Sequence, residues 1–366
     1  MKNKIYALIV SLVFVFLCIL IIDKSRINED VTFLEKKDVL HIFNNVERID
    51  LNSLQYHTKV TALEGGYDIY RPSGNGYRYG PSIIYNEDGS LDMWFSSPGN
   101  NSTKWDYIRY RHLDSDGNWS KEEIVLTPDN NSLDHFSVCD PGVIYFNGYY
   151  YLGYTSTTNE DGYDNNVFVC RSENPNGPFE KWNGEGWGGK PVPIIEFDED
   201  ESYWGAGEIS FCIKEEKLYC YYSWEGEEGY VVKVMTADLC DDWPNTLEYQ
   251  GIAFYKGSGE DSCDVVYVEE YDMFLAFAIE YRLSSMSKIV VYESYDGFNF
   301  NKATTVEENV VEYAHNIGIS KRLDGSIDLN DDLYISYAYD KGDYTWGKWY
   351  TYFQPIEIEI YLGTSE

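Results

Sequence analysis

Basic residues are scarce in this 366-residue chain, where Lys and Arg total 28 against 62 Asp and Glu, a formal net charge of −34. A field of that sign repels phosphate backbones and so excludes nucleic acid as a partner. No spaced oxygen-ligand loop of the EF-hand type is present, although the pairs Asp241-Asp242 and Asp331-Asp332 could hold a structural Ca²⁺. No metal ligand set is indicated, and we expect no cofactor to be required.

Cysteine patterns typical of metal or redox sites are also missing. Six cysteines lie outside the N-terminal segment, with no CxxC pair and no zinc spacing: Cys139, Cys170, Cys212, Cys220, Cys240 and Cys263. The hairpin register expected around residues 207–224 sets Cys212 opposite Tyr219, which disfavours a Cys212–Cys220 disulfide. We expect mostly free, buried thiols.

Long hydrophobic runs are absent except at the N-terminus, where Lys2 and Lys4 precede the apolar stretch Ile5–Ile22. No small-residue cleavage site follows Ile22, and "VFLC" lacks the small residue of a lipoprotein signal. Residues 1–22 are therefore predicted to be an uncleaved signal-anchor helix in the membrane, with a cleaved signal peptide as the alternative. Residues 23–45 read as a polar stalk and residues 46–366 as the folded domain, outside the cytoplasm. Nothing indicates an oligomeric state.

Helical periodicity is almost absent, whereas strand-forming aromatics are abundant, with 35 Tyr and 10 Trp. Such residues favour β-structure, and they also suit surfaces that stack on sugar rings. Hairpin patterns recur about every 60 residues. Aligned on the same offset before the turn, the five units begin at Gly80, Asp140, Glu208, Asp264 and Asn316.

Each unit continues into a second pair of strands, so the pattern predicts an all-β fold, a five-bladed β-propeller. Two β-sandwiches are the alternative, but they do not explain the shared offset. In a propeller the first strand of each blade lines the central channel. The unit-start residues, with His315 beside the last, should then meet in one funnel. Acids there could cap loops, bind an axial ion or carry out chemistry.

The opening "DPGVIYFNGYYYLGYTS" and the acids at unit starts resemble the five-bladed propeller glycoside hydrolases of the family 43 group. The last unit, "YAHNIGISKRLDGSIDLNDDLYISYAY", is similar to the related family 117, in which a fifth-blade histidine is the proposed acid. The resemblance covers roughly residues 60–360. It implies inverting acid–base hydrolysis of a poly- or oligosaccharide.

Carried over residue by residue, the resemblance makes Asp140 the general base and Asp264 the third carboxylate, which sets the pKa values of the others. The acid has two candidates, Glu208 and His315, and a histidine that only holds the channel together is an alternative for the second. Family 43 usually has its base in the first blade, where this chain has Gly80. Either the base has moved to the second blade, or the protein is a non-catalytic carbohydrate-binding propeller.

Further residues are predicted to bind substrate at the rim of the funnel. Trp204 and Trp224 could form an aromatic wall for a sugar ring, with core packing as the alternative. Arg78 could cross the funnel mouth or form a structural salt bridge. Glu280 ends a returning strand at the same rim, and Asn316 could bond a sugar hydroxyl or hold its own loop.

Overall fold

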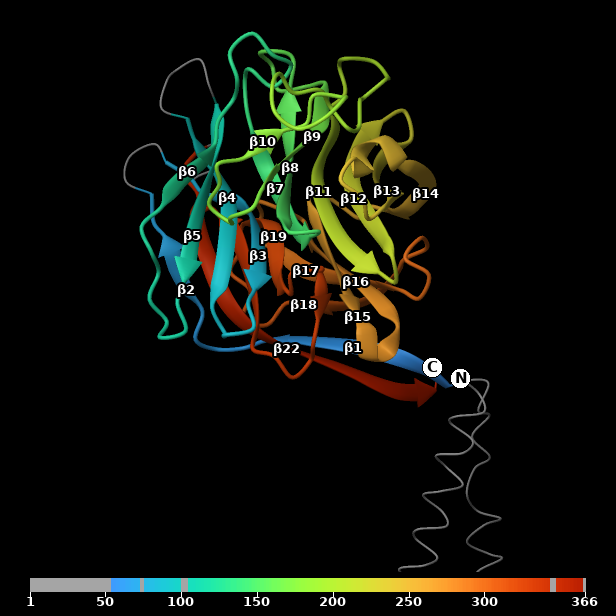
Figure 1. Cartoon of the computed structure of the whole chain (residues 1–366). Helices are drawn as coiled ribbons and strands as arrows, with labels where there is room; N and C mark the ends of the chain where they lie inside the picture. The colour runs from blue at the N-terminus through green and yellow to red at the C-terminus, as the bar shows by residue number, and fades with distance from the viewer. Residues whose placement is uncertain (1–53, 73–75, 100–104, 343–346, 365–366) are drawn as a thin grey trace, which may run out of the picture. The chain divides into compact units, whose positions relative to one another are not determined.

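β-Strands make up the regular structure of the chain, as the sequence predicts (Figure 1). The computed structural model describes residues 54–72, 76–99, 105–342 and 347–364. Within these ranges the other regular elements are two short 3₁₀ turns, η1 (Trp243–Thr246) and η2 (Glu269–Tyr271). No helix in the described ranges is long and apolar enough to cross a membrane. The predicted anchor (1–22) and stalk (23–45) lie outside the described residues.

The strands of residues Tyr56–Gly363 form consecutive antiparallel groups. The first contains β3 (Tyr79–Tyr85), β4 (Leu91–Pro98), β5 (Asp106–Leu113) and β6 (Glu123–Leu126). The second contains β7 (Cys139–Phe146), β8 (Tyr149–Thr157), β9 (Asn165–Ser172) and β10 (Glu180–Lys181). The third contains β11 (Gly205–Lys214), β12 (Lys217–Gly226), β13 (Gly229–Asp238) and β14 (Glu248–Tyr255). The fourth contains β15 (Cys263–Val268), β16 (Met273–Glu280), β17 (Lys288–Ser294) and β18 (Asn301–Val306).

The last group joins the two ends of the domain. It contains β19 (Ala314–Lys321), β21 (Leu333–Tyr339) and β22 (Tyr350–Thr364). The N-terminal strands β1 (Leu54–Ala62) and β2 (Tyr67–Tyr70) both pair with β22, and the short β20 (Ser326–Ile327) pairs with β15. Strands from the beginning and the end of the chain thus complete one sheet.

The first strands of the groups contact one another in a closed cycle. β3 contacts β7, β7 contacts β11, β11 contacts β15, β15 contacts β19, and β19 contacts β3. Two glycines allow the backbones to approach: a Cβ at Gly142 would lie 1.9 Å from the carbonyl oxygen of Ile209, and one at Gly318 would lie 1.9 Å from that of Pro81. Any larger residue would separate neighbouring strands. The ends of these strands consequently meet around one axis.

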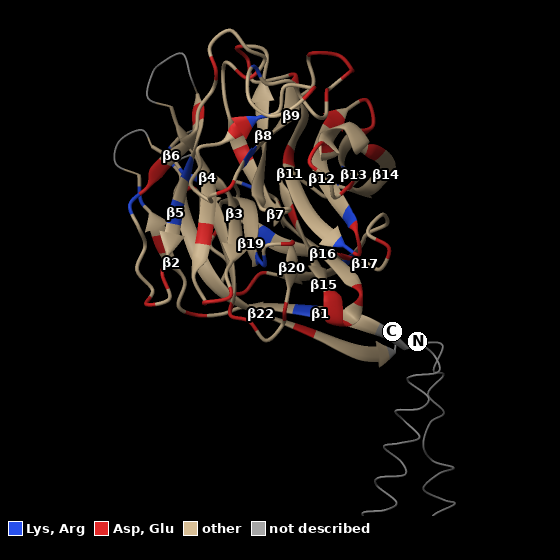
Figure 2. Cartoon of the chain, in the orientation of Figure 1, with Lys and Arg blue, Asp and Glu red and all other residues tan. Residues whose placement is uncertain are grey.

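The core lies between adjacent groups, where alternate apolar side chains of facing sheets are fully buried. The prediction of free, buried thiols is confirmed: the six cysteines of the described residues are free, and all but the half-buried Cys240 are buried. Cys212 pairs with Tyr219 in the predicted register. Acidic side chains are spread over many strands and loops rather than gathered in one block (Figure 2), which is typical of a solvated surface.

Candidate active site

A β-bulge interrupts the first strand of four groups at the predicted unit start. The pairing registers shift between Tyr79 and Ser82, Cys139 and Gly142, Gly207 and Ser210, and His315 and Ile317. The residue inside each bulge has a left-handed backbone, with φ of +58° at Gly80, +49° at Asp140, +52° at Glu208 and +48° at Asn316. For the non-glycine residues this conformation costs about 1–2 kcal/mol each. Strain of this kind is concentrated at functional sites.

Hydroxyl groups from the neighbouring group hold two of these strained residues. The Asp140 N–H donates to Ser96 Oγ at 2.8 Å, and the Glu208 N–H donates to Thr155 Oγ1 at 2.8 Å. Both N–H groups would otherwise be left without a strand partner by the bulge. The second strand of one group therefore positions the carboxyl of the next.

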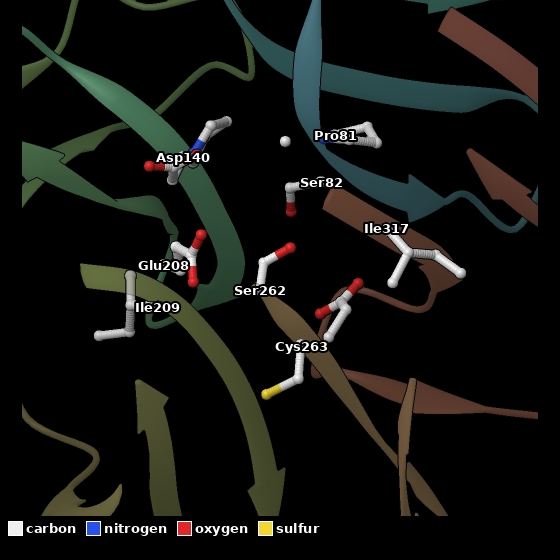
Figure 3. A pocket seen from close by; sticks show the side chains of 11 residues that line it. Pro81, Ser82, Asp140, Glu208, Ile209, Ser262, Cys263 and Ile317 are labelled. Atoms are coloured by element: carbon white, nitrogen blue, oxygen red, sulfur yellow. The ribbon is translucent and has the colours of Figure 1, made fainter. Parts of the chain in front are cut away.

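Asp140 and Glu208 both line a cavity of about 870 Å³ at the end of the first strands. His315, Asn316 and Trp204 line the same cavity. A narrower inner cavity of about 20 Å³ is also bordered by Asp140 and Glu208, which project from neighbouring strands near Ser262 (Figure 3). The structure thus brings together four of the predicted site residues and one predicted aromatic.

Asp140 lies where a side chain at position 80 of β3 would lie. A Cβ at Gly80 would come within 3.0 Å of Asp140 Oδ1 and 3.4 Å of Asp140 Cα. Glycine at position 80 therefore makes room for the Asp140 carboxyl. Oδ1 itself is buried and has no hydrogen-bond partner among the described residues. An orphaned carboxyl oxygen in a cavity wall is costly unless a ligand or a proton satisfies it.

The surroundings of Asp140 favour its neutral form. Burial raises the pKa of the Asp140 carboxyl well above its usual range, and the negative charge of Glu208 raises it further. Burial also raises the pKa of Glu208, but Lys256 opposes this effect. Lys256 Nζ lies 3.6 Å from Glu208 Oε2, which also accepts a hydrogen bond from Ser223 Oγ at 2.6 Å. Of the two carboxyls, Glu208 is the better stabilised as an anion.

Asp264 is held in a buried salt bridge and hydrogen bonds that join neighbouring strands. It lies in β15, which pairs with β16 without a bulge. Its Oδ1 lies 2.6 Å from Lys321 Nζ and accepts a 2.6 Å hydrogen bond from Ser210, while its Oδ2 accepts from the Ile319 N–H at 3.0 Å. Asp264 borders the inner cavity but not the large one. The carboxylate from this part of the chain whose charge raises the pKa of Glu208 is instead Asp261.

Asp261, three residues before Asp264, was missed by the repeat alignment. It raises the pKa of both Asp140 and Glu208, and its Oδ2 lies 3.3 Å from Arg282 Nη1. The signal was present in "DSCD", which offers two aspartates three residues apart. The offset shared with the other units selected the second of them.

Asp106 is another carboxylate that the sequence pattern did not select, and it lines the large cavity. It accepts hydrogen bonds from the hydroxyls of Tyr77, Tyr79 and Ser137. Burial raises its pKa to about 6, whereas the three hydroxyl groups lower it. Asp106 opens the third strand of its group, so an alignment of first strands could not find it.

The predicted substrate-binding residues divide into two sets. Trp204 and Asn316 line the large cavity. Trp224 is 6% exposed and borders a side pocket of about 50 Å³, with Lys233 Nζ 3.7 Å above its ring. Its face is therefore covered, and the partly exposed Trp105 and Tyr163 provide aromatic surface at the large cavity instead.

The two charged rim candidates pair with other side chains. Arg78 forms a salt bridge with Glu122 at 2.7 Å and lies over the ring of Tyr70. Glu280 is held by Lys302 at 3.0 Å and Lys288 at 3.6 Å. Neither borders the large cavity, whose wall contains Arg282 as its one basic side chain among the described residues.

Gly80→Ala tests whether Gly80 makes room for the Asp140 carboxyl. The left-handed backbone alone should cost about 1–2 kcal/mol of unfolding free energy. The new methyl group should also displace the Asp140 carboxyl and lower any activity of the site by about tenfold or more. Denaturant unfolding and activity measurements on the variant check both effects.

Gly117→Ala is the matched control for this substitution. Gly117 has a φ of +84°, and a Cβ there would meet nothing within 4 Å. It should show a similar loss of stability with unchanged activity. Equal activity in the two variants would contradict a specific contact between residue 80 and Asp140.

Comparisons with known proteins were made by family, by sequence and by structure. No family model matches the chain, and no curated protein matches its sequence. Solved structures do match. A family 117 glycoside hydrolase from the marine bacterium Zobellia galactanivorans superposes with a TM-score of 0.58 at 16% identity, covering 83% of this chain and 90% of that one.

Two further structures extend the likeness. A thermostable family 43 glycoside hydrolase gives a TM-score of 0.53 at 14% identity, covering 82% of this chain and 96% of that one. The α-L-arabinofuranosidase of Podospora anserina, solved in complex with cellotriose, gives 0.57 at 12% identity, covering 82% and 97%. The resemblance inferred from the sequence motifs is confirmed at the level of the fold, which is that of the propeller glycoside hydrolases. The proteins with these structures are named as glycoside hydrolases or as an arabinofuranosidase.

Proposed function

We propose that the chain is a five-bladed propeller glycoside hydrolase that cleaves a glycosidic bond of a poly- or oligosaccharide in the large cavity. The observation that supports this best is the pair formed by Asp140 and Glu208. One carboxyl has an orphaned, buried oxygen, and the other is stabilised as an anion by Lys256 and Ser223. Glycoside hydrolysis needs such a difference between two carboxyls.

The environments of the two carboxyls assign their roles. Asp140 holds a proton, so it is the general acid that protonates the glycosidic oxygen. Glu208 is the better stabilised anion of the two because of Lys256 and Ser223, so we assign it as the general base that removes a proton from water. This assignment reverses the sequence prediction, in which Asp140 was the base and Glu208 or His315 the acid. The reversal follows from Lys256, whose charge stabilises the Glu208 anion and which no sequence motif indicated.

Hydrolysis then proceeds with inversion at the anomeric carbon. Asp140 donates its proton to the leaving oxygen as the glycosidic bond breaks, and water activated by Glu208 attacks from the opposite face. The proton taken from water leaves Glu208 protonated and Asp140 ionised, and exchange with solvent restores the starting state. The negative charge of Asp261 raises the pKa of both carboxyls and so favours a proton on the pair. The reaction requires two carboxyls and water, and no cofactor.

The cavity suits a sugar larger than one ring. Its volume of about 870 Å³ lies in the upper part of the range usual for ligand sites. Trp105, Tyr163 and Trp204 border it and could stack on sugar faces. Because residues 1–22 predict a membrane anchor or a signal peptide, we place the reaction outside the cytoplasm on an external glycan.

Release of reducing sugar by the full-length protein tests this function. The panel should include arabino-oligosaccharides, since an endo-arabinase and an α-L-arabinofuranosidase share the fold, together with other neutral oligosaccharides. We expect turnover of at least one panel member by the wild-type protein and none by Asp140→Asn/Glu208→Gln. Saccharide binding without turnover in the wild-type protein would instead support the non-catalytic carbohydrate-binding propeller, motivated by Gly80.

A further inference from the structure

His315 has one ring nitrogen in a hydrogen bond and one without a partner. Its Nδ1 lies 2.5 Å from Asn316 Oδ1. Its Nε2 is buried and meets no hydrogen-bond partner among the described residues. The side chain is 2% exposed and borders the large cavity. A buried polar atom without a partner in a cavity wall is a position where a ligand can supply the missing hydrogen bond.

Asn316 determines which nitrogen of His315 carries the proton. Its Nδ2 group lies 3.3 Å from Glu208 Oε1 and 3.3 Å from Ser262 Oγ. An ionised Glu208 accepts hydrogen bonds only, so the amide nitrogen must face it and the amide oxygen must face the imidazole. His315 Nδ1 is then the donor, and Nε2 is left with a bare lone pair.

The ring is also held in place and kept neutral. Trp349 lies against it with ring centroids 4.3 Å apart, and Tyr79 lies beyond at 6.4 Å. Burial lowers the pKa of His315 to about 3, with a further lowering by Arg282 against the opposing effects of Asn316 and Asp340. A neutral imidazole with a bare Nε2 has no proton to donate at that atom. The structure thus argues against His315 as the general acid.

We propose that His315 Nε2 accepts a hydrogen bond from a hydroxyl group of the sugar bound in the cavity, and that Asn316 holds it in the acceptor state. The inference rests on the proposed function in taking the ligand to be a sugar and Glu208 to be the ionised carboxyl. His315 is then a specificity-determining residue. A sugar without a hydroxyl at that position leaves Nε2 unpaired, and a site built around such a bond discriminates strongly against it.

The first arm of the test needs no ligand. Nitrogen NMR of the full chain labelled with ¹⁵N-histidine, with His315→Phe to assign the signal, reports the tautomer directly. We expect His315 to be neutral, with Nδ1 protonated and Nε2 bare, from about pH 8 down to about pH 5. A protonated Nε2, or an imidazolium near pH 6, would overturn the proposal.

The second arm uses L-arabinose, D-galactose and their 2-, 3- and further monodeoxy forms as probes. We expect a parent sugar that binds to shift the His315 Nε2 signal, and one deoxy form to bind about tenfold or more weakly. In His315→Phe, which keeps the ring packing, that deoxy form and its parent should bind equally. His112→Phe is the matched control, because His112 is partly exposed, pairs with Asp92 and does not border the cavity.

The two arms separate failure of this inference from failure of the proposed function. A sugar that binds the wild-type protein without moving the Nε2 signal would overturn the hydroxyl contact alone. If none of these monosaccharides bound, the hydroxyl contact would fail, whereas the carbohydrate function would be overturned only if the oligosaccharide panel also showed neither binding nor turnover. A pH–rate profile of His315→Phe that lost its alkaline limb would show that His315 is the acid after all.

Discussion

Asp140→Asn is expected to slow hydrolysis of a glycan with a sugar leaving group by about 10²–10⁴-fold, and hydrolysis of a 2,4-dinitrophenyl glycoside far less. The difference arises because dinitrophenolate leaves without a proton, whereas a sugar oxygen needs the one that Asp140 supplies. The amide should keep the fold, since it preserves the shape of the side chain and the backbone bond to Ser96. The measurement is kcat/KM for both substrates.

Glu208→Gln should behave differently from Asp140→Asn. Loss of the base slows both substrates alike, and added azide should restore turnover as a glycosyl azide because it needs no deprotonation. Asp116→Asn, in an exposed turn, is the matched control and should leave both rates unchanged. If azide restored Asp140→Asn and the leaving group had no effect, Asp140 would be the base, as the family resemblance implied.

Lys321→Met is expected to cause the largest loss of stability. Its ammonium is fully buried and contacts Asp264 Oδ1 at 2.6 Å, with Ser210 Oγ at 3.2 Å and the carbonyl of Phe211 at 3.3 Å. These partners lie on β11 and β15, whereas Lys321 ends β19, so one side chain joins three first strands. Removing it leaves the Asp264 charge buried without its cation, which should cost about 3–5 kcal/mol. Denaturant unfolding measures this loss.

Two further variants make the stability result specific. Lys59→Met removes an exposed pair with Glu359 and should leave the unfolding midpoint unchanged. Lys321→Met/Asp264→Leu removes both buried charges and should recover much of the lost stability. A single variant as stable as wild type, or a double variant no better than the single one, would show that the pair does not clamp the strands.

The repeat along the chain predicted the all-β fold and placed Asp140 and Glu208 at equivalent positions, because strand alternation and turn offsets are local properties of the sequence. The same logic placed Asn316 and His315 beside them. Each of these residues borders the large cavity. The sequence pattern could detect where the first strand of each group starts, and these starts lie around the axis.

The sequence could not reveal contacts between groups of strands. Asp264 satisfied the offset, but its partner Lys321 is 57 residues away and makes it a structural ion pair. Trp224 and Arg78 were predicted at the rim because they are close in sequence to unit ends or starts. In the structure Lys233 lies over the Trp224 ring, and Glu122 forms a salt bridge with Arg78. The order of the pKa values of Asp140 and Glu208 likewise depends on Lys256, which no motif indicated.

Gly80 is the residue whose interpretation changes most between the sequence and the structure. From sequence alone, a glycine where a base is expected left two interpretations open: a base that had moved to Asp140, or a protein that only binds carbohydrate. The geometry shows that the Asp140 carboxyl fills that space, with Oδ1 only 3.0 Å from where a Cβ would be. The absence of a carboxylate at position 80 is therefore linked to the position of the Asp140 carboxyl.

The most direct test of the account is a ¹H NMR time course of the wild-type protein acting on the oligosaccharide panel. The account predicts that a free sugar accumulates, first as the anomer opposite in configuration to the bond cleaved, and that Asp140→Asn/Glu208→Gln produces none. The account would be contradicted if the wild-type protein bound an oligosaccharide of the panel but left every member unhydrolysed at each pH from about 4 to 8.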